Sequence, residues 1–411
     1  MSQPSSMPRR QRGVTLIELM VGVVIGLLAT LVIAQVSSVF EARRRQTVGG
    51  SDTQLTGALA LNTLQRDVQM GGYGLTSGGL TTGGAERCTE IRGRRNGTEY
   101  RWPMAPVLIT QGGGGSSSVT GRSDTVRVLM ASNNNRYAVP MRLQNHHRRD
   151  ATSFDLIPNT NVGNRLGDLL VAVPAIPGIG GQASPTWCSL LQISADPNNN
   201  TDTLEHLPNG SGPWNQDATA TVLPGALNAD IAYAASINDA RGSFLINVGT
   251  LTDRCYFVSD PDTTNSDQRC GLAADASETP YTLRLRSFNT TTTVTSNQDL
   301  FPNVINLQAL YGVASASASR TIDSWTTDTP TTSVAWDRVI AVRVGILARS
   351  TQYETDEVTT ARPTWMPDGT TAQQFTLPSC PVGENDCWKH YRYRVFESVI
   401  PLRNMLWQAL H

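Results

Sequence analysis

The sequence predicts an α+β fold, in which one long N-terminal helix precedes a large region of antiparallel β-sheet. Residues 19–34 contain no charged side chain, and apolar residues then recur at three- and four-residue intervals as far as Val68. From Tyr73 onward, short β-prone runs alternate with tracts of Gly, Ser, Asn and Asp that favour turns. We therefore expect a helix whose first half spans a membrane and whose second half packs on the sheet.

The composition is that of a folded protein with a membrane-directed N-terminus. The chain has 411 residues, of which 39% are hydrophobic, and its mean hydropathy is -0.23. A chain of this size can bury one large core or two modest ones. The formal net charge is -1, and the chain lacks the basic stripe of a nucleic-acid-binding protein, so we expect no nucleic-acid partner.

The first half of the helix, residues 14–40, is predicted to span the membrane. Its 27 residues would extend about 40 Å, which exceeds a hydrocarbon core of about 30 Å. It could be a signal anchor, or a cleaved secretory signal with Val32 and Ala34 before the cut and Gln35 after it. Neither interpretation gives Glu18 a purpose, because an acid inside a membrane costs about 2.5 to 3.5 kcal/mol on insertion scales.

A third interpretation comes from Gly13 and the residues that follow it. The run RRQRGVTLIELM has a basic leader that ends in glycine, then an apolar helix whose fifth residue is Glu18. This pattern closely resembles the processing signature of type IV prepilins. The resemblance implies that residues 1–13 are a leader, that prepilin peptidase cuts after Gly13, and that the new N-terminus at Val14 is methylated. Phenylalanine is the commoner residue at that position.

Cleavage would supply a counter-charge for Glu18. An unpaired carboxylate in lipid favours a positive partner, and the amine of Val14 in a neighbouring subunit of a filament can provide it. The resemblance implies that this pair recruits and registers subunits during assembly. The alternative is that Glu18 reaches the membrane interface from its place near the helix end. Gly22 and Gly26 form a GxxxG pattern, for which we expect close packing against other helices.

The second half of the helix is expected to cover residues 41–72 and to be amphipathic. Gly49 and Gly50 are expected to kink or locally melt it, and Gly71 and Gly72 to end it. Its apolar residues are expected on the face that packs on the globular region; they are Leu55, Leu59, Leu61, Leu64 and Val68.

The rest of the chain is expected to form strands and loops. The predicted strands are Thr125 to Met130, Leu169 to Val173, Phe244 to Val248, Tyr281 to Phe288 and Val339 to Leu347. Turn-rich tracts such as QGGGGSSS, from Gln111, and DPNNNTDT, from Asp196, favour antiparallel sheets over βαβ units. We divide the region into residues 73–300 and 301–411. Major pilins are far shorter than this chain, so an inserted β-rich region is expected between about residues 85 and 300.

Two C-terminal stretches narrow the resemblance. WDRVIAVRVGILARS, residues 336–350, and YRYRVFESVIPLRN, residues 391–404, are similar to the paired terminal strands of the PilW family of minor pilins. Their alternation places Val342, Val344 and Ile346 on one face of a strand. The resemblance implies a minor pilin that primes type IV pilus assembly and is incorporated at or near the pilus tip. It would support adhesion and twitching motility.

Partners and location follow from the same resemblance. The implied partners are other minor pilins, the major pilin, prepilin peptidase, an inner-membrane assembly platform and a large adhesin at the pilus tip. Before assembly the chain would span the inner membrane once, with its C-terminal region in the periplasm, and afterwards it would lie in the pilus fibre or tip. A minor pseudopilin of type II secretion and a membrane-anchored surface adhesin are the alternatives.

The cysteines indicate an oxidising compartment. All six follow the apolar segment, which suits disulfides on one side of a membrane. None forms a CxxC pair, so zinc is not expected. The short loops Cys255 with Cys270 and Cys380 with Cys387 are the favoured pairs, which leaves Cys88 with Cys188. Loops of such size could each contribute on the order of 2 to 3 kcal/mol.

We recognise no catalytic motif in the sequence, so we do not expect the protein to be an enzyme or to bind a cofactor. The sequence has no GxSxG elbow, no Walker A sequence and no HExxH. His146 and His147, beside Arg148 and Arg149, could be drawn as a ligand or phosphate site, but a chance cluster in a polar loop is the favoured interpretation. His206, after Glu205, is interpreted in the same way.

The strongest metal candidate is an acidic loop between two cysteines. Asp260, Asp262 and Asp267 offer oxygen ligands for calcium. The loop lacks the glycine and the terminal glutamate of an EF-hand, so no metal is expected, and these three residues remain a weak candidate.

Overall fold

The computed structural model describes most of the chain. The described residues are 13, 15–75, 88–113, 122–131, 140–175, 187–197, 202–208, 212–215, 231–238, 241–261, 265–275, 277–316, 319–365 and 373–404. The chain divides into two compact units, Met1–Asp52 and Thr53–His411, and each is described by itself.

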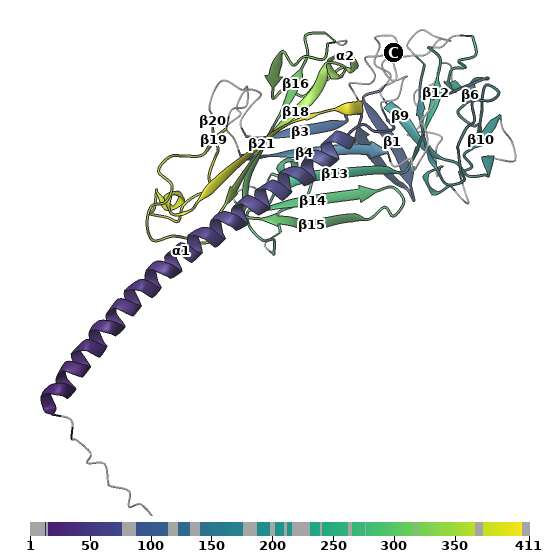
Figure 1. Cartoon of the computed structure of the whole chain (residues 1–411). Helices are drawn as coiled ribbons and strands as arrows, with labels where there is room; N and C mark the ends of the chain where they lie inside the picture. The colour runs from purple at the N-terminus through teal and green to yellow at the C-terminus, as the bar shows by residue number, and fades with distance from the viewer. Residues whose placement is uncertain are drawn as a thin grey trace, which may run out of the picture. The chain divides into compact units, whose positions relative to one another are not determined.

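Helix α1, Leu16–Met70, is one continuous helix of 55 residues (Figure 1). It ends directly before Gly71, where the sequence predicts the stop. The expected local melting at Gly49 and Gly50 does not occur, since both residues are helical. Each glycine costs only about 1 kcal/mol relative to alanine, and in a long helix the hydrogen bonds on both sides outweigh that cost.

The part of α1 in the first unit has the character of a membrane span. Residues Leu16–Glu41 are long and apolar enough to cross a bilayer, and none of that window is buried inside the protein. Leucine, valine and isoleucine side chains are exposed all round the helix between Leu16 and Val39. A helix that is apolar on every face requires an apolar surrounding, which a bilayer provides.

In the second unit, α1 packs into a core through one narrow stripe. Ala60, Leu64 and Val68 are fully buried there, whereas Leu55 and Leu59 are 62% and 47% exposed. The prediction that Leu55 and Leu59 lie on the buried face was therefore wrong. The buried stripe instead runs through small residues at Thr53, Gly57 and Ala60.

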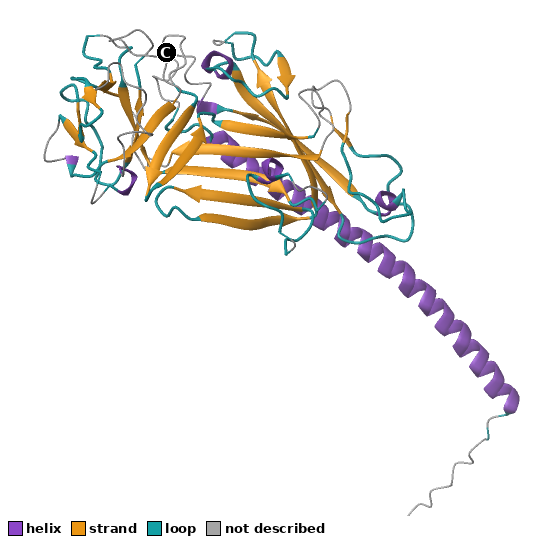
Figure 2. Ribbon diagram, turned by 180° about the vertical axis from the view of Figure 1, so that it is seen from behind, coloured by secondary structure: helices purple, strands orange, loops and turns teal. Residues whose placement is uncertain are grey.

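Two antiparallel sheets surround this stripe (Figure 2). The five-stranded sheet has the order β15-β14-β13-β4-β3, with β3 Val107–Gly112, β4 Arg122–Ala131, β13 Leu251–Val258, β14 Thr282–Asn289 and β15 Thr295–Pro302. The four-stranded sheet has the order β17-β16-β18-β21, with β16 Val304–Val313, β17 Ser324–Thr326, β18 Val339–Arg349 and β21 Tyr393–Pro401. Side chains of both sheets and of α1 form one hydrophobic core.

Strand β18 is buried on both of its faces. Val342, Val344 and Ile346 belong to the core shared with α1, as their predicted common face requires. On the opposite face, the Trp365 ring packs over Gly345, where an added Cβ would lie 2.5 Å from the ring. A second apolar cluster with Leu347 and Trp365 covers that side. This double burial explains the nearly continuous apolar sequence of the strand.

A six-stranded sheet lies beside these elements and has the order β2-β1-β9-β8-β12-β5. Its strands are β1 Glu90–Arg95, β2 Thr98–Pro103, β5 Met141–Arg142, β8 Leu169–Val173, β9 Trp187–Gln192 and β12 Phe244–Gly249. Only the β1–β9 pair is parallel among the described strands of this sheet. Separate hydrophobic cores draw on its alternating residues, for example Val171 in one and Ala172 in the other.

Short elements complete the described fold. Two ribbons pair β6 His147–Arg148 with β11 Ile231–Tyr233, and β7 Ser153–Asp155 with β10 Thr203–Glu205. The others are η3 Pro213–Asn215, η4 Ser266–Arg269, α2 Ser333–Trp336, η5 Cys387–His390 and the β19–β20 pair, Thr364–Trp365 with Gln373–Gln374. The predicted α+β class is confirmed, and all five predicted strands are present as β4, β8, β12, β14 and β18.

Candidate functional site

Thr15 and Glu18 form a capping box that starts α1. The Thr15 amide and hydroxyl both donate to Glu18 Oε2, each at 3.0 Å, and the Glu18 amide donates to Thr15 Oγ1 at 3.3 Å. The Leu19 amide donates to the Thr15 carbonyl at 3.1 Å, which makes Thr15 the N-cap and Glu18 the third helical residue. This capping role was not predicted from the sequence, although the T-x-x-E spacing is typical of a capping box.

The expected cleavage position lies just before this cap. Gly13 is exposed and is not helical, and it lies two residues before Thr15. Val14 lies outside the described residues. A backbone that has not entered the helix keeps its carbonyls free of intrahelical hydrogen bonds, as a peptidase substrate requires.

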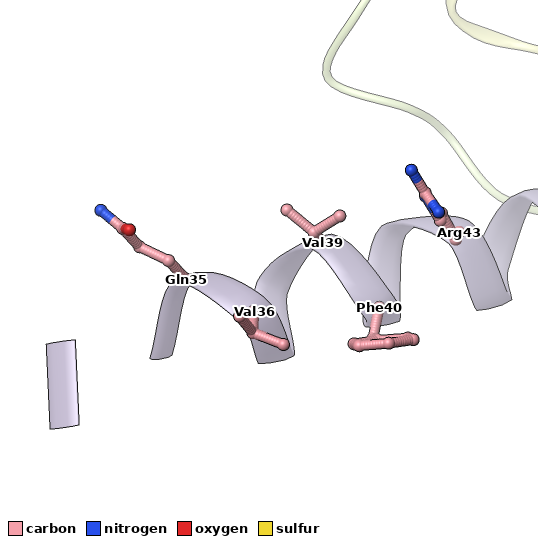
Figure 3. A pocket seen from close by; sticks show the side chains of 5 residues that line it. All are labelled: Gln35, Val36, Val39, Phe40 and Arg43. Carbon is pink, nitrogen blue, oxygen red and sulfur yellow. The ribbon is translucent and has the colours of Figure 1, made fainter. Parts of the chain in front are cut away.

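Gly22 and Gly26 leave open space on the apolar part of α1. A Cβ built on either residue would meet no atom of the chain within 4 Å. Farther along, Gln35, Val36, Val39, Phe40 and Arg43 line a shallow hollow (Figure 3). All five belong to the same helix, and one helix cannot enclose a small ligand, so this hollow is not a candidate ligand site.

A partly buried ion pair joins the second half of α1 to the five-stranded sheet. Arg254 Nη1 on β13 donates to both carboxylate oxygens of Asp67, at 2.7 and 2.9 Å. The Tyr256 hydroxyl donates to Asp67 Oδ2 at 2.5 Å. Burial, together with the Asp67 charge, raises the pKa of Tyr256, which keeps it a donor. These bonds fix the rotation of the helix on the sheet.

A close approach between Gly57 and Phe396 fixes the position of the N-terminal end of the packed part of α1. The ring of Phe396, on β21, lies so near Gly57 that a Cβ there would overlap three of its atoms. Phe396 packs against the core that α1 shares with the two sheets. Glycine at this position therefore sets how closely the helix lies on the four-stranded sheet.

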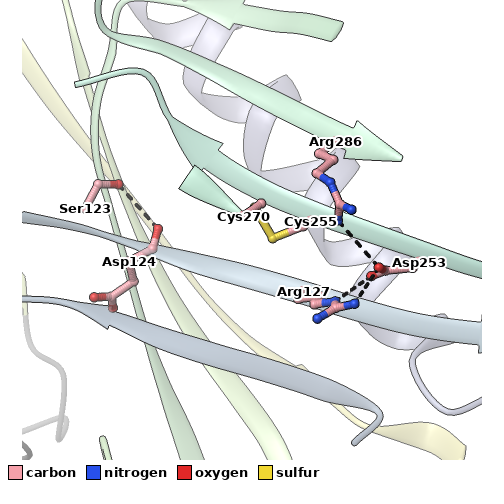
Figure 4. Close-up of a disulfide and its surroundings, with 7 residues drawn as sticks. All are labelled: Ser123, Asp124, Arg127, Asp253, Cys255, Cys270 and Arg286. Carbon is pink, nitrogen blue, oxygen red and sulfur yellow. Dashed lines mark hydrogen bonds and ion pairs between the residues drawn. A yellow bond between two sulfur atoms is a disulfide. The ribbon is translucent and has the colours of Figure 1, made fainter. Parts of the chain in front are cut away.

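Three disulfides join Cys88 to Cys188, Cys255 to Cys270, and Cys380 to Cys387. These are the same pairs that the sequence favours. Figure 4 shows the Cys255–Cys270 bridge, which joins β13 of the five-stranded sheet to the residue after η4. Beside it, buried Asp253 accepts two hydrogen bonds from Arg127, each at 2.7 Å, and lies 3.6 Å from Arg286.

The weak calcium candidates do not converge in the described part of the chain. Asp260 pairs with Arg122 at 3.4 Å, and Asp267 is exposed at the start of η4. Asp262 lies outside the described residues. Among the residues that the structure describes, no three His, Cys, Asp or Glu side chains are placed to hold one metal ion.

The histidines behave differently from the chance cluster expected in a polar loop. His146 is exposed, and its Nδ1 accepts a hydrogen bond from the Ala235 amide at 3.0 Å. His147 is buried and meets His206, with 2.8 Å between their Nε2 atoms. No sequence pattern indicates this pair, because its members are 59 positions apart in the chain.

Comparison with known proteins finds two family models in the chain. One, described as type IV pilus-assembly protein W, matches residues 256–404. The other, described as the prokaryotic N-terminal methylation motif, matches residues 8–34, which include Gly13 and Glu18. No match was found among curated proteins or among solved structures. The two matches confirm the resemblance to a PilW-family, pilin-like protein and agree with a membrane-anchored pilin.

Proposed function

Because the chain carries the N-terminal methylation motif and a C-terminal region similar to PilW, we propose that it is a minor pilin that helps prime type IV pilus assembly. The observation that carries the proposal is the capped start of α1, with a carboxylate in its first turn, directly after a glycine that ends a basic leader. Residues 1–13 would be removed by prepilin peptidase, and Val14 would become the methylated N-terminus.

Glu18 is the assembly residue in this proposal. The Thr15 amide and hydroxyl satisfy one of its oxygens by hydrogen bonding, but neither group carries a charge. In lipid, a carboxylate still favours a cation, and the amine created at Val14 of a neighbouring subunit is the nearest source. Gly22 and Gly26 would allow the helices of adjoining subunits to approach closely.

The β-rich region would act outside the membrane. Its three disulfides suit the periplasm, where we place it before assembly, with α1 in the inner membrane. We propose that the assembled subunit lies at or near the pilus tip with other minor pilins, above the major pilin. The inserted region, residues 85–300, would contact these partners or a large adhesin and thereby support adhesion and twitching motility.

Two experiments test the proposal. The mass of the N-terminal peptide from native membranes should correspond to a chain beginning at Val14, with or without one methyl group. A peptide beginning at Gln35, or an intact leader, would overturn it. Recovery of the subunit in a short periplasmic secretion filament, and its absence from sheared pili, would favour the pseudopilin instead.

The second experiment separates the charge of Glu18 from its capping role. Glu18→Gln retains a capping-box side chain but has no charge, whereas Glu18→Ala loses both. If charge pairing drives assembly, both variants should be processed yet be depleted from sheared pili. Glu41→Gln, at the far end of the apolar segment, is the control and should be recovered normally. Normal recovery of Glu18→Gln would refute the pairing.

A further inference from the structure

The six-stranded sheet has a cover made of two small ribbons. The β6–β11 and β7–β10 ribbons lie over residues of β8, β9 and β12, and their apolar side chains form one buried cluster with the sheet. Each ribbon has only two or three paired positions. So few paired positions provide little stability by themselves. Backbone hydrogen bonds from the Ser194 amide to the Glu205 carbonyl, at 2.9 Å, and from the Gln144 amide to the Asp155 carbonyl, at 2.8 Å, join the ribbons to the rest of this region, and side-chain contacts add to them.

The side chains that join the two ribbons are His147, from β6, and His206, which follows β10. Both are nearly inaccessible, at 3% and 2% exposure. The Phe154 ring lies 4.0 Å from the His147 ring and 4.8 Å from the His206 ring, centroid to centroid, and Tyr233 packs 5.8 Å from His147. We name these four residues the histidine latch.

The hydrogen bond between the two rings can form only when at least one of the histidines is uncharged. At 2.8 Å between Nε2 atoms there is room for one hydrogen, so one ring donates and the other must offer a lone pair. The Nδ1 atoms of both rings lack a hydrogen-bond partner within the described residues. Two charged imidazoles would place an N–H against an N–H, with two like charges in an apolar enclosure.

Nearby groups offer no compensating charge in the described part of the chain. The titratable group that faces the pair is Tyr233, whose hydroxyl donates to Ser189 on β9 at 2.5 Å, and burial raises the pKa of Tyr233. Arg148, Glu205 and Asp155, which belong to the same ribbons, are exposed. Burial accordingly lowers the pKa of His206 to about 4, and burial with the adjacent His206 lowers the pKa of His147 to about 2.

We propose that the histidine latch is an acid-sensitive closure, which holds both ribbons on the six-stranded sheet near neutral pH and releases them when the histidines become charged. Release would uncover apolar residues of β8, β9 and β12 and make them available to a partner. The device belongs to the inserted region and does not depend on the proposed role in pilus assembly.

The direction and size of the pH effect follow from linkage. The folded state binds fewer protons than an open state in which histidine titrates near 6.5, so closure is complete above that pH and is lost as the pH falls below it. Between pH 8 and pH 5, the opening equilibrium should rise about 30-fold for each histidine that becomes charged on opening.

Hydrogen exchange of the full chain in detergent micelles tests the proposal. Backbone amides of the two ribbons, near Phe154, Leu204 and Tyr233, should lose protection between pH 8 and pH 5, after correction for the intrinsic pH dependence of exchange. Those of β16 and β18 should keep their protection. Unchanged ribbon protection at pH 5 would overturn the proposal, and this comparison needs no variant.

Substitutions identify the responsible groups. His147→Gln combined with His206→Gln removes both titrations and leaves amides that can bond to each other, so the ribbons should show the same protection at both pH values. His146→Gln, the exposed neighbour, is the matched control and should keep the wild-type pH response. A pH response that survives in the double variant, or disappears in the control, would refute the latch.

Discussion

Replacing Gly57 with alanine should destabilise the protein, although alanine is the better helix former. Alanine contributes about 1 kcal/mol relative to glycine inside a helix. The new Cβ would overlap three ring atoms of Phe396, and such overpacking costs typically about 1 to 3 kcal/mol. Phe396 is only partly buried and can shift, so we expect a net loss of about 1 kcal/mol. In a chain of this size, that loss lowers Tm by about 1 °C.

Thermal unfolding of the full chain in detergent measures this effect, and Gly50→Ala is the matched control. Gly50 lies in the same helix, but a Cβ there would meet no atom within 4 Å. The control should therefore gain stability from helix propensity alone, so the two substitutions should shift Tm in opposite directions. A Gly57→Ala protein that is as stable as the Gly50→Ala protein would refute the close approach of α1 to β21.

Two further predictions concern buried carboxylates. Asp67→Asn removes the charge that accepts two hydrogen bonds from Arg254. Because Arg254 is partly exposed, the expected loss in the free energy of unfolding is about 1 to 2 kcal/mol, measured with urea. Asp52→Asn, at an exposed position, is the control, and equal urea midpoints for the two variants would contradict a stabilising Asp67–Arg254 pair. Burial raises the pKa of Asp124 to about 7, although its oxygens accept bonds from the Gly112 and Ala309 amides at 2.7 and 2.8 Å. The folded state therefore binds a proton that the unfolded carboxyl releases near 3.8, so the stabilisation is present below about pH 4 and is lost as the pH rises through 7. Asp124→Asn should gain stability relative to wild type between pH 5 and pH 8, and a constant difference between the two urea midpoints would contradict this assignment.

Helix α1 shows what apolar spacing can and cannot establish. The spacing correctly predicts that Leu64 and Val68 are buried, but the same pattern misplaces Leu55 and Leu59. Helical geometry decides between them: at about 100° per residue, Leu55 and Leu59 lie roughly 140 to 180° round the helix from Leu64. The buried residues Thr53, Gly57 and Ala60 lie on the same side as Leu64. Counting three- and four-residue intervals overlooks this, because the two-residue step from Leu59 to Leu61 carries the apolar pattern to the other side of the helix.

The strands also differ in how well the sequence predicts them. Long strands such as β4 and β18 carry enough β-branched residues to be recognised from sequence alone. The ribbon strands β6 and β10 have two or three residues and no alternation of their own, so they exist only through tertiary contacts. His147 lies on β6 and His206 directly follows β10, which is why their pairing could not be predicted.

Glu18 was recognised by its position after Gly13, but the structure changes what its presence means. A capping box alone does not explain an acid there, since glutamine at the same position satisfies the cap equally well. A negative charge near a helix N-terminus gains typically about 0.3 to 1 kcal/mol from the helix dipole. Inserting an acid into a membrane costs about 2.5 to 3.5 kcal/mol, which exceeds that gain. We propose that a positive partner, the amine at Val14 of a neighbouring subunit, offsets the remaining cost.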